Sequence, residues 1–228
     1  MNLWADFLSN DSYNQFEKWK HYFPIYEKHL SHFVYKPLLI FEIGCLLGGS
    51  LRMWKRYLGP NAQIVGIDIV PGCKVLEDDQ IQIRIGEQQD ISFLQGLIDE
   101  FGTPDIVVDD GSHIQSHVIT TFQFLYPKLS KNGIYVVEDI HTSYWHDWGG
   151  GLRKEGTFME LCKHLVDELN ADHTMNERHS TAQLPITEFT NTTMSMHFYN
   201  SMVIFERGRY LNKGVLTTGK HPFYVGKS

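Results

Sequence analysis

Residues 104–139, PDIVVDDGSHIQSHVITTFQFLYPKLSKNGIYVVED, decide the fold class of this chain, because they hold two short apolar runs with a helical segment between them. Both runs are rich in β-branched residues, as strands buried on both faces are. Ile114, Val118, Phe122 and Leu125 recur between them at the spacing of one helical face. This stretch therefore predicts a strand, a helix and a second, parallel strand.

The same alternation continues toward the N-terminus. Three more apolar runs occur there: LLIFEIG (38–44), QIVGIDI (63–69) and IQIRIG (81–86). Segments with helical spacing follow the first and third runs, and this order is typical of a doubly wound sheet with right-handed crossovers. We expect an α/β fold with a mostly parallel, seven-stranded, Rossmann-like sheet.

The C-terminal third departs from this alternation. FMELCKHLVDELN (158–170) has the pattern of an amphipathic helix. TMSMHFYNSMVIFER (193–207) consists of two alternating runs around Tyr199-Asn200-Ser201, which predicts a hairpin that closes the sheet with an antiparallel pair.

The chain is long enough for one substantial domain with extensions. Aromatic and aliphatic residues in 11–35 follow a helical pattern broken only by Pro24, so we expect residues 1–35 to form a helical cap on a domain spanning 36–228. Residues 150–190 are predicted to be a polar, substrate-side lid. The tail, 208–228, is expected to be weakly structured.

Composition narrows the class of partner. The net charge of -7 and the pI near 5.9 argue against nucleic acid, whose binders carry clustered Lys and Arg. Cys45, Cys73 and Cys162 are odd in number and widely spaced, which favours neither a disulfide framework nor a zinc knuckle. No signal peptide and no long apolar stretch is evident, so we expect a cytoplasmic protein without a membrane partner, while a homo-oligomer stays open.

The turn after the first predicted strand indicates a cofactor site. Gly44 and Gly48 are spaced G-x-x-x-G rather than GxGxxG, and Glu42 precedes them. An acidic side chain there suits the methionine ammonium of S-adenosylmethionine (SAM) and would repel a pyrophosphate. Asp68, near the next strand end, is placed to accept hydrogen bonds from ribose hydroxyls. The residues assigned to the rest of the cofactor are Gln88, Gln89, Asp90 and Asp109.

The ends of the fourth and fifth predicted strands indicate the chemical site. Asp110, Glu138 and Asp139 should converge there, and three carboxylates in one cleft need a cation or a proton. Oxygen ligands favour Mg²⁺, with Mn²⁺ and Ca²⁺ open and a zinc pair of His113 with His117 less suited. His113 is placed to remove a proton from a hydroxyl as general base.

Two other interpretations stay open. A nicotinamide-dependent oxidoreductase shares this fold but leaves the acidic clusters unexplained, and a non-catalytic SAM-binding protein would not need them. Single features are ambiguous as well, since a strand-end Asp often caps the next helix. Residues 144–151, which hold three aromatic side chains and three glycines, could wall a sugar ring or simply pack.

Residues 106–145, together with FEIGCLLGGSL upstream, resemble the macrocin and mycinamicin sugar O-methyltransferases and the related cephalosporin hydroxylases. The likeness covers roughly residues 20–145 and departs at the N-terminus and in 150–190. It implies a SAM-dependent, Mg²⁺-assisted O-methyltransferase with Asp110, Glu138 and Asp139 as metal ligands and His113 as base. Glu42, Gly44 and Asp68 would lie at SAM. The expected acceptor is a hydroxyl of a small molecule, a sugar or another vicinal diol such as a catechol.

Overall fold

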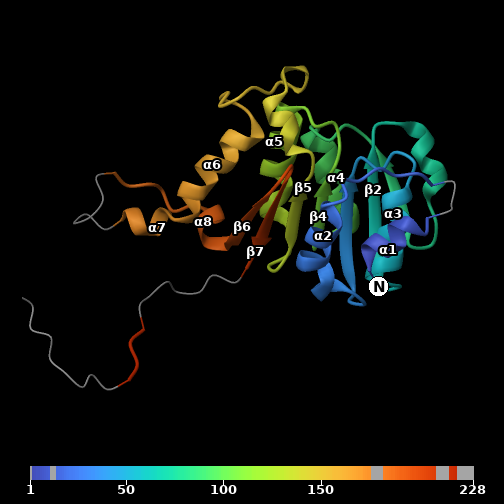
Figure 1. The fold of residues 1–228 in the computed structure, drawn as a ribbon, viewed down its shortest axis with the longest axis horizontal. Helices are drawn as coiled ribbons and strands as arrows, with labels where there is room; N and C mark the ends of the chain where they lie inside the picture. The colour runs from blue at the N-terminus through green and yellow to red at the C-terminus, as the bar shows by residue number, and fades with distance from the viewer. Residues whose placement is uncertain (1, 11–13, 176–181, 209–215, 220–228) are drawn as a thin grey trace, which may run out of the picture.

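The computed structural model describes residues 2–10, 14–175, 182–208 and 216–219. Its centre is a seven-stranded sheet in the order β3-β2-β1-β4-β5-β7-β6 (Figure 1). The first five strands are parallel and β7 runs antiparallel to β5, as the sequence predicted. The strands are β1 (Leu38–Ile43), β2 (Ala62–Asp68), β3 (Ile81–Ile85), β4 (Ile106–Asp109), β5 (Ile134–Val137), β6 (Thr193–Tyr199) and β7 (Met202–Arg207).

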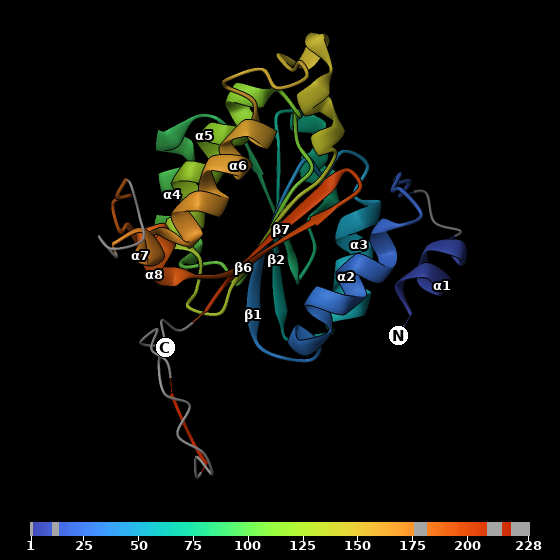
Figure 2. The same cartoon turned by 60° about the vertical axis from the view of Figure 1, so that its left-hand side comes forward.

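Helices cover both faces of this sheet, which lies between two helical layers in Figure 2. One layer holds α1 (Leu3–Leu8), α2 (Tyr22–Leu30) and α3 (Gly49–Leu58). The other holds α4 (Ile91–Phe101), α5 (Gln115–Leu125) and α6 (Phe158–Leu169). Short helices complete the chain: α7 (Ala171–Thr174), α8 (Glu188–Thr192), and the 3₁₀ turns η1 (Ser31–Phe33), η2 (Pro71–Leu76), η3 (Tyr126–Lys128), η4 (Ile140–Tyr144) and η5 (His146–Trp148).

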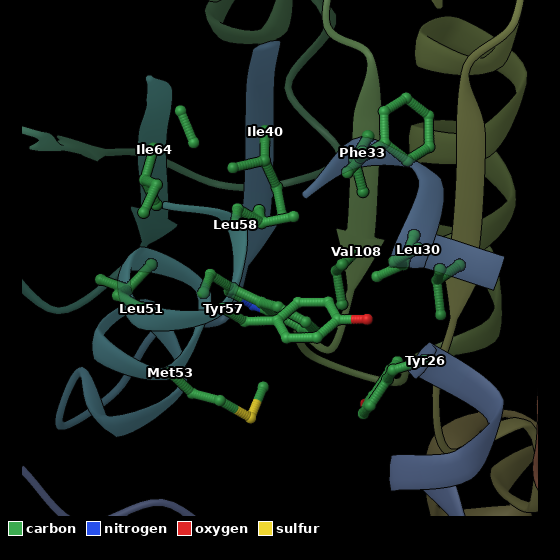
Figure 3. Close-up of a cluster of buried hydrophobic side chains, with 14 of the residues drawn as sticks. Tyr26, Leu30, Phe33, Ile40, Leu51, Met53, Tyr57, Leu58, Ile64 and Val108 are labelled. Carbon is green, nitrogen blue, oxygen red and sulfur yellow. The ribbon is translucent and has the colours of Figure 1, made fainter. Parts of the chain in front are cut away.

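The two helical layers enclose two apolar cores, because successive side chains of a strand point to opposite faces. All six residues of β1 are buried. Ile40 packs with the α2 and α3 side, whereas Leu39 and Phe41 pack with α4 and α5. Figure 3 shows the first of these cores, where Tyr26 and Leu30 of α2 approach the sheet beside Val108. The continuous apolar runs of the sequence thus reflect burial on both faces.

The N-terminal segment differs from the sequence-based expectation in two ways. The chain from Asn14 to Lys18 is not helical, although Phe16 and Trp19 fit the helical spacing. Pro24 does not interrupt a helix but lies in the first turn of α2. A first turn suits proline, because its backbone N–H groups need no intrahelical partner. Helix α2 therefore begins at Tyr22, later than the aromatic pattern suggested.

The predicted C-terminal hairpin is confirmed, and its turn reaches the end of β5. β6 and β7 pair antiparallel, and Ser201 in the turn adopts a left-handed φ of 64°. The Ser201 carbonyl accepts the Ile140 amide at 3.1 Å, which ties the hairpin to the segment after β5.

Residues 150–190 contain the predicted helix α6, whose Phe158, Cys162 and Leu165 join the core, and the two short helices α7 and α8. Residues 176–181 and most of the tail, at 209–215 and 220–228, lie outside the described residues. Within the described part of the chain, no helix combines the length and apolar character needed to cross a membrane.

Candidate active site

A cavity of about 710 Å³ opens at the carboxyl ends of the parallel strands. β1 and β4 are neighbours whose crossovers lead to opposite sides, and ligands of open α/β sheets bind at such a switch point. The wall comes from the ends of β1, β2 and β4, from the turn after β3 and from residues 15–18 of the N-terminal segment. The non-helical stretch before α2 thus covers a ligand-sized cavity.

Four of the residues predicted to bind the cofactor line this cavity: Gly44, Asp68, Gln88 and Gln89. Gly44 has a φ of 82°, and a Cβ atom there would lie 2.2 Å from the Asp110 carbonyl oxygen, so no larger residue fits. The Asp68 carboxylate accepts the amides of Cys45 and Leu46, at 3.1 and 2.9 Å. Asp68 therefore fixes the glycine turn as well as facing the cavity.

Three other predicted cofactor residues do not line the cavity, and each has a structural place instead. Asp90 is the N-cap of α4 and accepts the Ser92 and Phe93 amides. Asp109 is buried under Gln88, whose amide nitrogen lies 3.2 Å from its carboxylate, and burial raises the pKa of Asp109 to about 7. Gly48 is the left-handed residue before α3, packed against the side chain of Leu76.

Glu42 does not line the cavity, although Ile43 and Gly44, which follow it, do. Its side chain is fully buried, and neither carboxylate oxygen reaches a donor with hydrogen-bond geometry. Burial raises the pKa of Glu42 to about 7, although the Lys18 charge and the nearby Ser50 and Trp54 act in the opposite direction. An unpartnered buried carboxylate is costly, which marks this position as one that a cationic ligand group would stabilise.

The structure brings the predicted acidic residues together and supplies a cation from the N-terminal segment. Lys18 Nζ lies 2.5 Å from Asp110 Oδ2 and 2.8 Å from Glu138 Oε2, and the lysine side chain is only 2% exposed. Burial alone would lower the pKa of Lys18, but the charges of Asp110, Glu138 and Glu42 raise it above its ordinary value. The lysine is thus a charged ammonium held between two carboxylates.

Glu138 is the most enclosed of the three carboxylates. Besides both bonds from Lys18, it accepts the Tyr26 hydroxyl at 2.5 Å. Burial and the Asp110 charge raise the pKa of Glu138 to about 8, against the opposing effect of Lys18. The carboxylate of Glu138 faces Lys18 and Tyr26, and Glu138 does not line the cavity.

Asp139 and His113 form the open side of the cluster. The coordinating atoms of Asp110, His113 and Asp139 all lie within 4.8 Å of one another. Asp139 is fixed by the Tyr22 hydroxyl at 2.7 Å and by the Trp19 indole N–H at 3.1 Å. His113 and Asp139 both have left-handed backbones, with φ of 57° and 51°. Such conformations are unfavourable for residues with a Cβ atom, and they recur at functional sites.

Sequence reasoning missed the contribution of the N-terminal segment. Lys18, Trp19, Tyr22 and Tyr26 bind the acidic cluster across 92 to 120 residues of chain, and no local spacing marks such contacts. The signal was indirect, since three converging carboxylates need a cation or a proton. Lys18 meets this need for two of the three carboxylates, Asp110 and Glu138.

Exposed aromatic side chains flank the open side of this cluster. Trp19 and Trp145 are each about half exposed, at 54% and 48%. The His141 ring lies between them, with ring centroids 5.9 Å from Trp19 and 4.4 Å from Trp145. Trp148 continues the row at 5.3 Å from Trp145. The aromatic segment noted in the sequence therefore forms a partly open wall next to Asp139.

Comparison with known proteins identifies relatives by sequence. The chain is 34% identical over 203 residues to an 8-demethyl-8-(2-methoxy-alpha-L-rhamnosyl)-tetracenomycin-C 3'-O-methyltransferase of Streptomyces olivaceus, covering 84% of this chain and 50% of the relative. It is 33% identical over 210 residues to the mycinamicin VI 2''-O-methyltransferase of Micromonospora griseorubida, covering 86% and 51%. This chain is a relative of the sugar O-methyltransferases.

Solved structures agree with this relationship. The relative MycE, a methyltransferase of the mycinamycin pathway determined with Mg, SAH and mycinamycin VI, superposes with a TM-score of 0.78 at 31% identity. The alignment covers 94% of this chain and 55% of MycE. The resemblance and the Rossmann-like methyltransferase fold predicted from the sequence are thereby confirmed. No family model matches the chain. The chain spans about half the length of the curated relatives it matches.

Proposed function

We propose that this protein is a SAM-dependent, Mg²⁺-assisted O-methyltransferase that acts on a hydroxyl of a small molecule, a sugar or a glycosylated natural product. The observation that carries the proposal is the position of the acidic cluster at the mouth of the cofactor-sized cavity, with Asp110 and His113 belonging to both. The named activities of its relatives, and the Mg and SAH of the MycE structure, support the same chemistry.

The residues around the cavity fit the two groups that this chemistry needs. Lys18 is a positive charge already bound between Asp110 and Glu138, so these carboxylates form a site for a cation. The buried, unpartnered Glu42 suits a cationic amino group above it. Asp68, Gln88 and Gln89 offer polar atoms along the cavity wall for a nucleoside.

In this proposal, Asp110, Glu138 and Asp139 hold the metal, and Gly44, Asp68, Gln88 and Gln89 contact SAM. SAM would supply the electrophilic methyl group, and Mg²⁺ the Lewis acidity that orients the acceptor and favours loss of its proton. His113 Nε2, 3.9 Å from Asp110 and 3.8 Å from Asp139, would accept the proton of the acceptor hydroxyl.

The acceptor would approach along the aromatic wall. Trp19, whose indole N–H binds Asp139, and Trp145 are each about half exposed and would offer apolar surface to a sugar ring. Residues 150–157, which lead from this wall into α6, would then control access to this side, whereas α6 itself belongs to the core. Protease cleavage concentrated there in the free protein and reduced by cofactor plus acceptor would support that role, whereas uniform resistance would count against it.

A screen of methyl transfer from labelled SAM onto deoxysugar conjugates and catechols tests the proposed function. Label transfer that requires a divalent cation supports it. SAM binding without transfer to any hydroxyl would favour a non-catalytic binding protein. Bleaching of a nicotinamide hydride donor on turnover would favour an oxidoreductase instead.

A further inference from the structure

A second group of metal-ligating side chains lies outside the cavity, where α2 packs against the C-terminal hairpin. His29 of α2, His197 of β6 and Glu206 of β7 bring their coordinating atoms within 4.8 Å of one another. None of the three lines the cofactor cavity. The cluster is therefore separate from the proposed cofactor site.

The carboxylate of Glu206 connects the two imidazoles. Its Oε1 lies 2.7 Å from His29 Nδ1, and its Oε2 lies 3.4 Å from His197 Nε2. The rings are tilted by 57° with centroids 4.6 Å apart, so they are not stacked. One nitrogen of each ring thus lies near the same carboxylate, and the Ser195 hydroxyl bridges the longer pair, 3.0 Å from His197 Nε2 and 2.7 Å from Glu206 Oε2.

The protonation states of this cluster suit a metal ion. Burial lowers the pKa of His29, whose side chain is 3% exposed, and so favours the neutral imidazole that can bind a metal. Burial would raise the pKa of Glu206, but the bonds to His29 and Ser195 lower it overall. His197 and Glu206 remain about 30% exposed, at 31% and 29%, so an ion can reach the centre from solvent.

The surrounding hydrogen bonds allow His29 to change tautomer without losing a partner. His29 Nε2 lies 2.8 Å from the Tyr199 hydroxyl, which also accepts Lys28 Nζ at 3.0 Å. If Nδ1 gave its lone pair to a metal, the proton would sit on Nε2 and be donated to the Tyr199 oxygen. Metal-bound histidines usually have such a partner on the second nitrogen, because it fixes the ring orientation.

We propose that His29, His197 and Glu206 form a second metal site, one that takes a zinc-like divalent ion and cross-links α2 to the β6–β7 hairpin. Two imidazoles and one carboxylate are a ligand set that Zn²⁺ accepts, with a fourth position left for water. The acidic cluster, by contrast, is dominated by oxygen ligands that suit Mg²⁺. The ion would hold in place the helix that carries Tyr22 and Tyr26, the hydrogen-bond donors to Asp139 and Glu138.

The test measures the binding of Zn²⁺ and Co²⁺ to the full chain in the presence of excess Mg²⁺. The chain carries His113→Gln, so that the acidic cluster offers no imidazole ligand. Calorimetry should find one zinc equivalent, and Zn²⁺ should raise the melting temperature. Co²⁺ should give the visible bands of a four-coordinate site without the near-ultraviolet thiolate band expected from the other candidate cluster, Cys45 with Cys73.

Adding His197→Gln should weaken zinc binding at least about 10-fold and remove the rise in melting temperature. Glu206→Gln should do the same and serves as a second variant, since both side chains are partly exposed and far-ultraviolet circular dichroism reports their folding. His164→Gln, on the exposed side of α6, is the matched control and should change nothing. Zinc affinity unchanged by both ligand variants, or no zinc binding, would overturn the proposal. Neither readout depends on methyl transfer.

Discussion

Replacing Lys18 with Met tests whether the acidic cluster depends on the cation that the N-terminal segment supplies. Methionine keeps most of the length and apolar surface of lysine but removes the charge that contacts Asp110 and Glu138. Removing one partner of a buried ion pair costs about 3–5 kcal/mol of unfolding free energy, because the other charge stays buried and unpaired.

The structure puts the expected loss toward the lower end of that range. Asp110 is 21% exposed and can recruit water, and burial already raises the pKa of Glu138 to about 8, so that carboxylate can take a proton instead. For a chain of this size, a loss of about 3 kcal/mol lowers the melting temperature by roughly 6–12 °C. Thermal unfolding followed by circular dichroism in metal-free buffer measures this shift.

Magnesium should reverse part of the loss, because both cations neutralise the same carboxylates. The rise in melting temperature on adding Mg²⁺ should be larger for Lys18→Met than for the matched control Lys20→Met. Lys20 is an exposed lysine two positions away, with its ammonium 5.2 Å from the Trp4 ring centroid, and its loss should cost less than about 1 kcal/mol. Equal melting temperatures for the two variants in metal-free buffer, or equal responses to Mg²⁺, would refute the reasoning.

Three further outcomes follow from the site. Asp68→Ala should weaken SAM binding in calorimetry by at least about 10-fold through lost ribose contacts. Asp90→Ala, which removes a helix cap, should lower the free energy of unfolding by about 1 kcal/mol and leave SAM affinity unchanged. Equal SAM affinities of the two variants would remove Asp68 from the ribose role. His113→Ala should retain SAM and metal binding but lose about 100-fold in kcat, while His146→Ala, at an exposed histidine, should leave kcat unchanged. Chelator should abolish turnover and Mg²⁺ should restore it. Full activity in chelator would contradict the metal assignment. Trp145→Ala should raise KM for a sugar acceptor with little effect on SAM affinity, and an unchanged KM would exclude the aromatic wall from acceptor binding.

The fold was predictable because its signals are local. Each parallel strand is a short apolar run between turn residues, and the predicted runs differ from the observed strands only by residues at their ends. The run around Val107, for example, continues in sequence to Gly111, but the strand ends at Asp109, where pairing with β5 stops. The hairpin was predictable for the same reason, since its alternation and its turn at Asn200 and Ser201 lie within one short segment.

The N-terminal segment was not predictable in the same way. Phe16 and Trp19 have helical spacing, yet their positions follow from where the segment crosses the sheet: Phe16 lines the cavity and Trp19 binds Asp139. Spacing reports helical periodicity only when one face of a helix is buried. In an extended segment that lies over a cavity, the positions of aromatic residues follow the contacts with the underlying surface and not a helical period.

Residue type alone did not identify the site residues, because one residue type can fill several structural roles. An Asp after a strand can face a ligand or cap the next helix, and the sequence does not distinguish Asp68, which lines the cavity, from Asp90, which caps α4. Convergence was a stronger signal than residue type. Asp110 and Asp139 follow adjacent strands, and a parallel sheet brings the residues after such strands to one edge whatever the role of their side chains.

The need to neutralise charge connects the N-terminal segment to the chemistry. Asp110 and Glu138 come from the sheet, but the ammonium between them comes from Lys18, and the hydroxyls that fix Glu138 and Asp139 come from α2. The same segment walls the cavity, so closing the cavity and ordering the carboxylates require the same piece of chain. A metal ion placed among these carboxylates must share them with Lys18 or displace it, and either change acts on the wall of the cofactor cavity. Metal binding and cofactor binding should therefore be energetically coupled through residues 14–30 rather than through the sheet.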